Sequence, residues 1–224
     1  MRIGILGGTG PQGRGLGRRF AMAGHEVLLG SRDAARAAQA AAELAGAGLA
    51  GAGSVSGVAN AEAARAEIVV VAVPYEGHAD LLASLADELA GTLVVDCVNP
   101  LGFDKQGPFP LEVPDGSAAQ EAQRILPRST VVGAFHNVSA RLLDDPSVTH
   151  IPGDVLVLGE DREAVARVID LVPAIPGSRG VYAGRLRLAR TVESLTANLI
   201  AVNRRYKTHS GISIAGLPDT ADAS

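Results

Sequence analysis

Short apolar runs alternate along the chain with amphipathic or alanine-rich segments. The runs are continuously apolar rather than alternately apolar and polar, which is typical of strands buried on both faces of a parallel sheet. Proline or glycine follows several of them, as in AEIVVVAVP and TLVVDCVNP. The pattern predicts strands at 2–6, 26–30, 53–57, 66–74, 92–100, 130–136 and 154–160.

The segments between these strands have the composition and the boundaries of helices. Pro11 suits the first turn of a helix, Gly24 suits its end, and Asp33 can cap the alanine-rich segment that follows it. Because strands and helices alternate over most of the chain, we expect an α/β fold with a Rossmann-type, doubly wound, mostly parallel sheet. Helices are predicted at 11–24, 34–46, 78–90, 117–126 and 161–172, and loops around 46–57 and at 101–116.

The pattern changes after Gly184, where residues 185–206 predict one long helix with a narrow apolar seam. This seam has two interpretations: it packs on the chain's own first domain, or it forms a dimer interface. We favour a homodimer, and we expect a Rossmann-like domain at 1–184, a small helical domain at 185–224 and a frayed end at 217–224. The seam consists of Leu188, Val192, Leu195, Leu199 and Val202.

Composition narrows the class of protein. The 224 residues are 47% hydrophobic but only 3% aromatic, so the core must be aliphatic, and the net charge of −4 disfavours nucleic acid as a partner. The single cysteine, Cys97, rules out an internal disulfide and fits the cytoplasm. The longest apolar run, 68–74, is too short to span a membrane, and MRIGILGG is not a signal peptide. We therefore expect a cytoplasmic protein without a membrane partner.

The first strand leads into a glycine-rich loop. Gly8-Thr-Gly10-Pro-Gln-Gly13 matches the G-x-G-x-x-G pattern, and it stands between a predicted strand and a predicted helix, as this dinucleotide-binding motif requires. In the motif the first glycine allows a tight turn, the second lets the backbone approach a pyrophosphate, and the third lets helix and strand pack closely. Backbone N–H groups from Thr9 to Gln12 are then predicted to bind the pyrophosphate.

The second strand ends in GSRDAAR, where NAD-binding proteins usually carry an acidic residue that binds the ribose 2′-OH. Ser31 offers a hydroxyl here, and Arg32 a guanidinium that can bind phosphate through two N–H groups. Arg36 follows one helical turn later. These residues favour NADP over NAD, unless the arginines are merely solvated surface charges. Asp33 is interpreted as a helix cap that points away from the ribose.

Four blocks of the sequence have a familiar pattern: ILGGTGPQGRGLGRRFAMAGHEVLLGSR, VAVPYEGH, VVGAFHNVSA and RTVESLTANLIAVNRRYKTHSGISIAGLP. Through them, over nearly its whole length, the chain resembles the NADPH:F420 oxidoreductase family. Members of that family pass hydride between NADP(H) and the 8-hydroxy-5-deazaflavin coenzyme F420. The first block is shared with many NADP reductases, whereas the last two are more specific.

The resemblance implies a set of cofactor-binding residues. It implies that Thr9, Gly10, Pro11 and Gln12 form the pyrophosphate loop, that Ser31, Arg32 and Arg36 hold the 2′-phosphate, and that the C-terminal part closes over the deazaflavin and makes the dimer. Ser139 stands where some members carry proline. The remaining residues implied to lie at the ribose, nicotinamide or deazaflavin are Val73, Pro74, Val98, Asn99, His136, Val138, Ser139 and Ala140.

Direct hydride transfer between two rings needs no side chain as acid or base, so we expect no essential catalytic residue and no metal. His136 can donate a hydrogen bond to the deazaflavin, or its ring can be satisfied by backbone. Cys97 is interpreted as a small buried hydrophobe. Basic residues that can attract the anionic F420 tail, or else form a solvated helix face, are Arg185, Arg187, Arg190, Arg204, Arg205 and Lys207, the last three around Tyr206.

Two other functions remain open from the residues. One is an NADPH-dependent reductase of a small imine or 2-oxo acid, which usually needs a Lys, Asp or Tyr to protonate the product. The only lysines, Lys105 and Lys207, follow no predicted strand end, which counts against it. The other is a non-catalytic NADPH-binding redox sensor with the same phosphate-binding residues. No G-x-S-x-G motif occurs, which disfavours a hydrolase.

Overall fold

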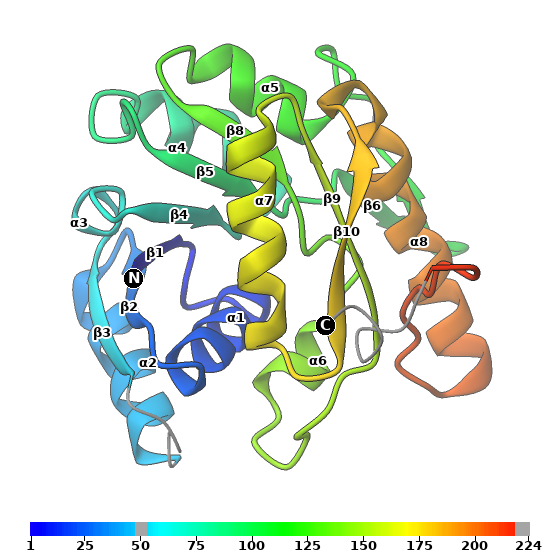
Figure 1. The fold of residues 1–224 in the computed structure, drawn as a ribbon, viewed down its shortest axis with the longest axis horizontal. Coiled ribbons are helices and arrows are strands. Elements are labelled where there is room, and N and C mark those ends of the chain that lie inside the picture. The colour runs from blue at the N-terminus through cyan, green and yellow to red at the C-terminus, as the bar shows by residue number, and fades with distance from the viewer. Residues whose placement is uncertain (48–52, 218–224) are drawn as a thin grey trace.

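The computed structural model describes residues 1–47 and 53–217. Within them an eight-stranded sheet has the order β10-β9-β8-β5-β4-β1-β2-β3 (Figure 1). The six strands from β3 to β8 in this order are parallel, which confirms the Rossmann-type, mostly parallel sheet. Its strands are β1 (Arg2–Leu6), β2 (Glu26–Ser31), β3 (Ser54–Ala59), β4 (Ile68–Val71), β5 (Leu93–Asp96), β8 (Thr130–Gly133), β9 (Gly153–Gly159) and β10 (Ser178–Gly184).

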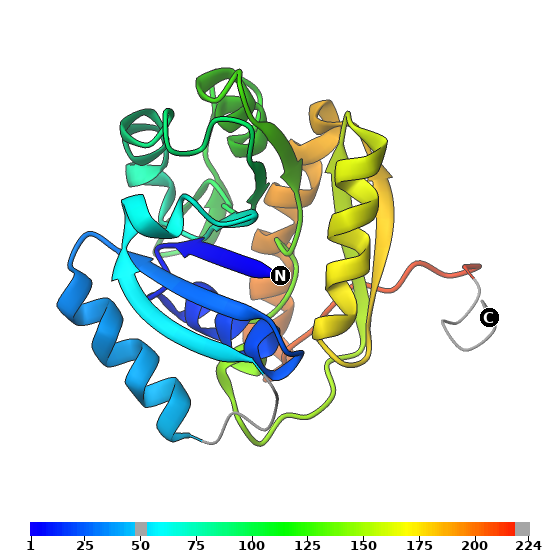
Figure 2. The same ribbon diagram turned by 60° about the vertical axis from the view of Figure 1, so that its left-hand side comes forward.

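Helices cover both faces of the sheet, because the strands send alternate side chains into two separate apolar layers. One layer contains α1 (Pro11–Met22), α2 (Ala34–Gly46), α6 (Ala140–Asp144) and α7 (Arg162–Leu171). The other contains α3 (Asn60–Ala63), α4 (His78–Ser84), α5 (Ala118–Ile125) and α8 (Ala189–Tyr206). Figure 2 shows α7 and α8 on opposite sides of the β9–β10 edge. None of the helices in the described ranges has the length and apolar character of a membrane span.

Side-chain caps start several helices where the sequence predicts them. Asp33 accepts hydrogen bonds from the backbone N–H groups of Ala35 and Arg36, which confirms it as the cap of α2. Ser117 and Asp161 cap α5 and α7 in the same way. The predicted helices at 34–46, 117–126 and 161–172 therefore match the structure to within a residue or so.

The predicted loop at 101–116 is wrong over its first half, which forms a two-stranded hairpin. β6 (Leu101–Asp104) and β7 (Gly107–Pro110) pair antiparallel. Asp104 Oδ1 accepts hydrogen bonds from two backbone N–H groups of the turn, and Gly107 takes a φ of 125°. The sequence analysis missed β7 because it contains Pro108 and Pro110, and proline is rare in strands except at sheet edges.

Other boundaries also differ from the prediction. The helix predicted at 78–90 ends at Ser84, and the strand predicted at 130–136 ends at Gly133, so His136 follows the sheet rather than ending a strand. α8 starts at Ala189, after the 3-10 turn Leu186–Leu188, and not at 185. α6 and the half-buried strand β10 were not predicted. The strand predicted at 53–57 is confirmed as β3 and extends to Ala59, while most of the predicted loop before it and most of the predicted frayed end lie outside the described residues.

The last two strands run against the rest of the sheet. β9 pairs antiparallel with β8, and β10 pairs parallel with β9. The carboxyl end of β10 therefore lies at the edge opposite to the carboxyl ends of the first six strands. Because α8 follows β10, it begins at that opposite edge, and its last turns come back toward the edge where β1, β2, β4 and β5 end (Figure 1).

A buried arginine on α1 anchors the unpredicted segment around α6. Arg19 is 1% exposed. Its guanidinium donates hydrogen bonds of 2.6–3.1 Å to four backbone carbonyls, those of Leu142, Leu143, Asp145 and Val148. These carbonyls lie at and beyond the end of a short helix, where no helical N–H is available to them. The carbonyl of Asp145 also accepts the backbone N–H of Val148 at 3.2 Å, whereas Arg19 supplies the donor for the other three and so fixes α6 against α1.

Arg19→Met is expected to lower the free energy of unfolding by about 3 kcal/mol or more, because it leaves buried carbonyls unpaired. Urea titration followed by circular dichroism measures the change. The matched control is Arg65→Met, which removes an exposed ion pair with Glu88 and is expected to cost less than about 1 kcal/mol. Equal losses in the two variants would contradict the anchoring role.

Candidate functional site

Two clefts, each of about 620 Å³, lie on either side of the start of α1. Their linings share no residue, but Thr9 and Gly10 line one while Gln12 lines the other, so the glycine loop separates them. We call them the glycine-loop cleft and the α8 cleft. Seven predicted site residues line the glycine-loop cleft: Thr9, Gly10, Ser31, Arg32, Arg36, Val73 and Pro74. Six line the α8 cleft: Gln12, Asn99, His136, Val138, Ser139 and Ala140.

The other two predicted residues line neither cleft. Pro11 occupies the first turn of α1, where it is exposed. Val98 is buried, and its backbone N–H donates a hydrogen bond to Asp96 Oδ1 at 3.0 Å. Proline has no backbone N–H, so Pro11 can contribute only shape to the pyrophosphate loop.

The glycine loop has the expected compactness, with one change in the roles of its glycines. The left-handed residue of the turn is Gly7, with a φ of 75°, rather than the first glycine of the motif. A Cβ on Gly8 would lie 2.9 Å from the backbone of Leu29, and a Cβ on Gly13 would lie 2.8 Å from Gly7 and Gly8. Gly8 and Gly13 thus allow strand, loop and helix to approach closely, while a Cβ on Gly10 would meet only one atom, at 3.5 Å.

The end of β2 brings the predicted serine and arginines together. Ser31 Oγ accepts a hydrogen bond from the N–H of Asp33 at 3.2 Å, and the Asp33 carboxylate is used as the α2 cap. Arg32 and Arg36 are exposed at the glycine-loop cleft. Within the described residues neither guanidinium forms an ion pair. Both positive charges therefore remain available to a ligand in this cleft.

Asn60 belongs to the glycine-loop cleft, although the sequence analysis missed it. It follows the carboxyl end of β3, is 8% exposed, and has a buried Oδ1 without a hydrogen-bond partner in the described part of the chain. Such an unpaired acceptor is costly unless a ligand supplies a donor. Its position after a strand end is a signal that could have identified it, but the strand prediction ended at residue 57.

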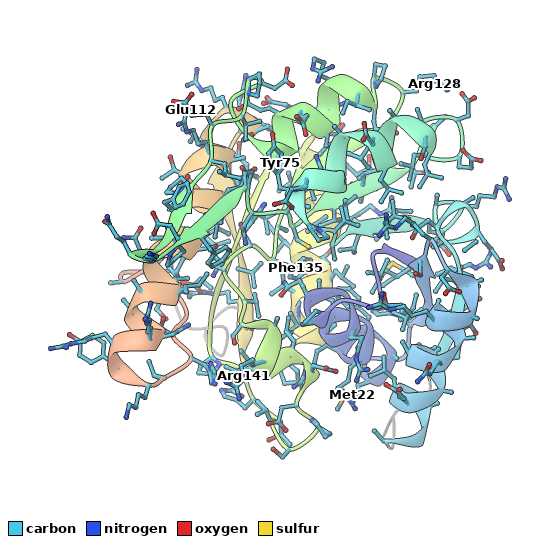
Figure 3. The ribbon with its side chains drawn as sticks, turned by 180° about the vertical axis from the view of Figure 1, so that it is seen from behind. Met22, Tyr75, Glu112, Arg128, Phe135 and Arg141 are labelled. Carbon is cyan, nitrogen blue, oxygen red and sulfur yellow. The ribbon has the colours of Figure 1, made fainter. Side chains whose placement is uncertain are left out.

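The α8 cleft contains a loop whose backbone is held by side chains from α1, from α8 and from the segment after β5. Phe135 is a buried non-glycine residue with a φ of 64° (Figure 3). Gln12 Nε2, on α1, donates to the carbonyl of Phe135 at 3.1 Å. Asn99 Nδ2 and Thr196 Oγ1 both donate to the carbonyl of His136, at 3.0 and 2.9 Å. The side chain of Gln12 therefore supports this loop, while the role of its backbone N–H at the pyrophosphate stays a prediction.

The His136 ring lies at the inner wall of the α8 cleft. It is 2% exposed, and neither ring nitrogen has a hydrogen-bond partner among the described residues, so its ring is not satisfied by backbone. Burial lowers the pKa of His136 to about 4, against an opposing effect of Asp96. The imidazole is therefore neutral near pH 7, with one donor and one acceptor nitrogen for a ligand.

Basic residues surround the mouth of the α8 cleft. Arg141, Arg204 and Lys207 line it, together with His209. Of the other predicted basic residues, Arg185 forms an ion pair with Glu160, and Arg187, Arg190, Arg205 and Tyr206 do not line this cleft. Only two of the predicted basic residues thus reach the cleft, and Arg141 joins them from α6.

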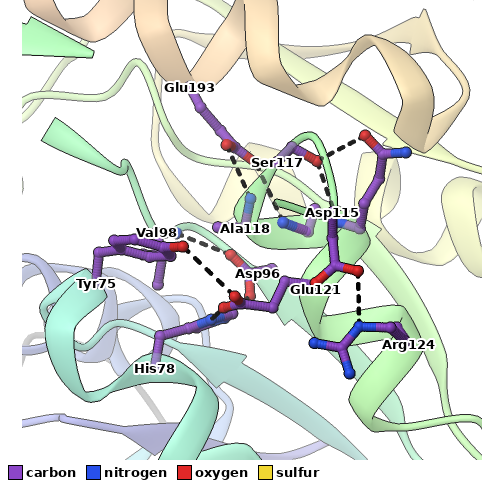
Figure 4. Close-up of polar contacts among 12 residues, drawn as sticks. Tyr75, His78, Asp96, Val98, Asp115, Ser117, Ala118, Glu121, Arg124 and Glu193 are labelled. Atoms are coloured by element: carbon purple, nitrogen blue, oxygen red, sulfur yellow. Dashed lines mark hydrogen bonds and ion pairs between the residues drawn. The ribbon is translucent and has the colours of Figure 1, made fainter. Parts of the chain in front are cut away.

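The sequence analysis did not find a buried charged cluster, whose polar contacts Figure 4 shows. His78 Nδ1 lies 2.8 Å from Glu121 Oε2, and its Nε2 lies 2.7 Å from Asp96 Oδ2. All three side chains are buried. Burial alone would lower the pKa of His78, but the attraction and hydrogen bonds of Asp96 and Glu121 prevail and raise it to about 9. Both ring nitrogens therefore donate, and His78 is an imidazolium.

Glu193 of α8 extends this cluster. It is 2% exposed, and its carboxylate accepts hydrogen bonds from the N–H groups of Ala118 and Ala119 at the start of α5. Burial, with a contribution from Asp96, raises the pKa of Glu193 to about 7. The Tyr75 hydroxyl donates to Glu121 Oε1 at 3.4 Å from the opposite side. Five titratable groups from four segments thus share one interior site.

The remaining candidate groups are structural. Cys97 is buried, and its Sγ contacts the carbonyl of Val71 at 3.0 Å. Burial raises the pKa of its thiol, which agrees with its interpretation as a small hydrophobe. Over residues 1–47 and 53–217, no cluster of three His, Cys, Asp or Glu side chains is arranged to hold a metal ion.

Comparison with known proteins finds a matching family model over the first part of the chain and relatives that align with nearly all of it. A family model described as "NADP oxidoreductase coenzyme F420-dependent" matches residues 2–100. The F420-dependent NADP reductase of Methanothermobacter thermautotrophicus is 36% identical, over 98% of this chain and 97% of that protein. The reductase of the same name from Methanocaldococcus jannaschii is 38% identical, over 97% and 99%. A crystal structure of a putative F420-dependent NADP reductase from Arthrobacter sp. FB24 aligns with a TM-score of 0.76 at 30% identity, over 96% of this chain and 99% of that one.

The charged cluster makes stability depend on pH. The pKa of His78 is about 9 in the folded chain and about 6.5 when exposed, so its contribution is complete below pH 6.5 and lost as the pH rises through 9. We expect the free energy of unfolding to fall by about 2–3 kcal/mol between pH 7 and pH 9.5 through this group. Glu193, with a pKa raised to about 7, titrates around the lower limit of this window, and Asp96, Glu121 and Tyr75 are the other groups that face the ring.

Urea titrations at both pH values measure this loss, with His78→Gln as the reference that lacks the titrating group. The difference between the wild type and the variant isolates His78 from the other groups that titrate in this range. Parallel pH dependences for the two proteins would contradict the assignment of an imidazolium.

Proposed function

Because the chain belongs to the family of F420-dependent NADP reductases, we propose that it transfers hydride reversibly between NADP(H) and coenzyme F420 across its two clefts. The chain is an oxidoreductase of this family. The observation that carries the residue-level proposal is the pair of clefts on either side of residues 9–12. Direct transfer requires the reacting atoms of the two rings to approach within about 3–3.5 Å, so we propose that the nicotinamide and the deazaflavin meet where the two clefts adjoin at this loop.

The glycine-loop cleft fits NADP(H). The start of α1 has no acidic residue in its first turn, so its N–H groups and helix dipole favour a pyrophosphate next to Thr9 and Gly10. Ser31, Arg32 and Arg36 provide a hydroxyl and two free guanidinium groups for the 2′-phosphate. Val73 and Pro74 form the wall on the β4 side. Asn60 adds an unsatisfied acceptor that a bound nucleotide can pair.

The α8 cleft fits F420. Its inner wall holds the neutral, unpartnered imidazole of His136, beside Val138, Ser139 and Ala140, where a flat polar ring system has both surface and hydrogen-bonding groups. Arg141, Arg204 and Lys207 at the rim suit the anionic tail. Asn99 supports this wall through the His136 carbonyl.

When bound, the two coenzymes supply the chemistry, in which a hydride passes directly between the nicotinamide and the deazaflavin. The protein contributes orientation, because side chains on rigid strand ends hold the walls of both clefts. His136 is neutral near pH 7, so we assign it a hydrogen-bonding rather than an acid role. We therefore propose no side chain as an essential acid or base.

We propose that the protein is a cytoplasmic homodimer. The two interpretations of the α8 seam divide along the helix: Val192 packs inside the chain, whereas Val202 is 38% exposed. Exposed Tyr206 and the hairpin residues Phe103 and Phe109 add further apolar surface.

The division of the chain into two domains at residue 184 also stays a proposal, and the buried Glu193 joins the two parts. The single buried cysteine supports the reducing cytoplasm.

Mixing the purified protein with NADPH and F420 is expected to bleach the visible absorbance of the deazaflavin, which a spectrophotometer follows directly. Turnover of imines or 2-oxo acids alone would instead support a small-molecule reductase. Tight NADPH binding without any turnover would support a redox sensor.

Arg32→Ala is expected to raise the apparent KM for NADPH more than about tenfold and to change that for NADH little, because one charge-assisted contact to the 2′-phosphate is lost. Steady-state kinetics with both nucleotides measure the ratio. Arg65→Ala is the matched control, because it removes an exposed arginine that does not line the glycine-loop cleft. Equal losses with NADPH and NADH would refute the 2′-phosphate site.

Leu195→Glu combined with Val202→Glu is expected to convert the dimer to monomers, because both charges would enter the proposed interface. Size-exclusion chromatography with light scattering measures the mass. Leu199 is left unchanged because it lines the α8 cleft. Tyr182→Glu, which alters an exposed apolar residue on β10, is the control. An unchanged dimer in the double variant would rule out this interface.

A further inference from the structure

The buried charged cluster stands between the walls of the two clefts. On one side, His78 directly follows the turn Tyr75–Gly77, and Pro74, Glu76 and Gly77 line the glycine-loop cleft. On the other side, Asp96 Oδ1 accepts the N–H of Val98 at 3.0 Å, and the next residue, Asn99, lines the α8 cleft. The cluster therefore contacts the backbone that carries both walls.

The hydrogen bonds continue from the cluster into the α8 cleft. Asn99 Nδ2 donates to the His136 carbonyl at 3.0 Å, and Thr196 Oγ1 donates to the same oxygen at 2.9 Å. Thr196 lies three residues after Glu193 on α8, and so on the same side of the helix. Because Glu193 is fixed to the start of α5, it also fixes the position from which Thr196 reaches this carbonyl.

Stability alone is a weak explanation for such a cluster. Burying an ion pair costs desolvation energy that is often not recovered, so a well-packed apolar interior would hold α4, β5 and α5 together equally well. A hydrogen-bonded imidazolium between two carboxylates differs from apolar packing in one respect, because it fixes directions as well as contacts. The bond of 2.7 Å ends on Asp96 of β5, the strand that precedes the cleft-lining residue Asn99. The bond of 2.8 Å ends on Glu121 of α5, the helix whose start is bound by Glu193 of α8.

We propose that His78, Asp96 and Glu121 are positioning residues that hold the two cleft walls in the alignment that hydride transfer requires. This inference rests on the proposed function, since it assigns one coenzyme to each cleft. None of the three residues lines a cleft, so they act through Glu76 and Gly77 on one side and through Val98, Asn99 and His136 on the other.

The principal test is Glu121→Gln, which keeps a hydrogen-bonding side chain of the same shape but removes one charge. Loss of alignment is expected to lower kcat about tenfold to a hundredfold, because a displacement of about 1 Å can cost that much in rate. The KM values for NADPH and F420 are expected to stay within about threefold, since the cleft-lining residues are unchanged. His78→Gln is expected to have the same effect in larger measure.

The isotope effect separates alignment from general destabilisation. With NADPH deuterated at the transferred hydrogen, the isotope effect on kcat is expected to increase in Glu121→Gln, because the hydride step becomes more rate-limiting. All rates are normalised to the concentration of NADPH-binding sites, so unfolded protein does not contribute. Arg124→Ala is the matched control, because it removes an exposed ion pair with Asp115 from the same helix.

Each outcome decides the proposal. A kcat within twofold of the wild type, with only a lower melting temperature, would overturn it and leave a structural role. A raised KM with unchanged kcat and isotope effect would overturn it as well. A wild type that binds NADPH but never reduces F420 would refute the proposed function, and this inference with it, whereas an active wild type with an indifferent Glu121→Gln refutes this inference alone.

Discussion

Buried backbone carbonyls need hydrogen-bond donors, and at the functional edge of this sheet side chains supply them. The loops that follow β8 leave the sheet and have no ladder partners. Arg19 pairs four of their carbonyls, Gln12 pairs that of Phe135, and Asn99 and Thr196 share that of His136. Without these long-range bonds the loop at 134–148 would have no fixed path, and the α8 cleft, which residues 136–141 line, would have no defined inner wall.

Much of the fold could be predicted because its signals are local. A buried parallel strand is a continuous apolar run, and a helix start is an Asp33, Ser117 or Asp161 in the right place. The positions of β1, β2 and α2 were predicted closely for that reason, whereas the strands predicted at 66–74 and 92–100 are shorter in the structure, Ile68–Val71 and Leu93–Asp96. The hairpin at 101–110 could not be, because its prolines argue against strands and only its edge position tolerates them.

The candidate site divides in the same way. Residues at or shortly after the carboxyl end of a strand, such as Ser31 and Asn99, could be assigned to the functional edge from the order of elements alone. His78 and Glu121 could not, because they are 43 residues apart and look like surface residues of two ordinary helices. A buried polar cluster is defined by which side chains meet in space, and one sequence without aligned relatives carries no signal of that meeting. Arg19 was missed for the same reason.

The reversed pair β9 and β10 gives α8 an unusual task. Since β10 ends at the edge away from the clefts, the helix must run along one face of the sheet from that edge to the opposite one. It thereby brings Thr196, Arg204 and Lys207 to the α8 cleft. Its 18 residues give it a length of about 27 Å. The number of residues in α8 therefore sets both where its basic residues lie and which way they face. Insertion of a single residue before Thr196 would rotate Arg204 and Lys207 by about 100° around the helix axis.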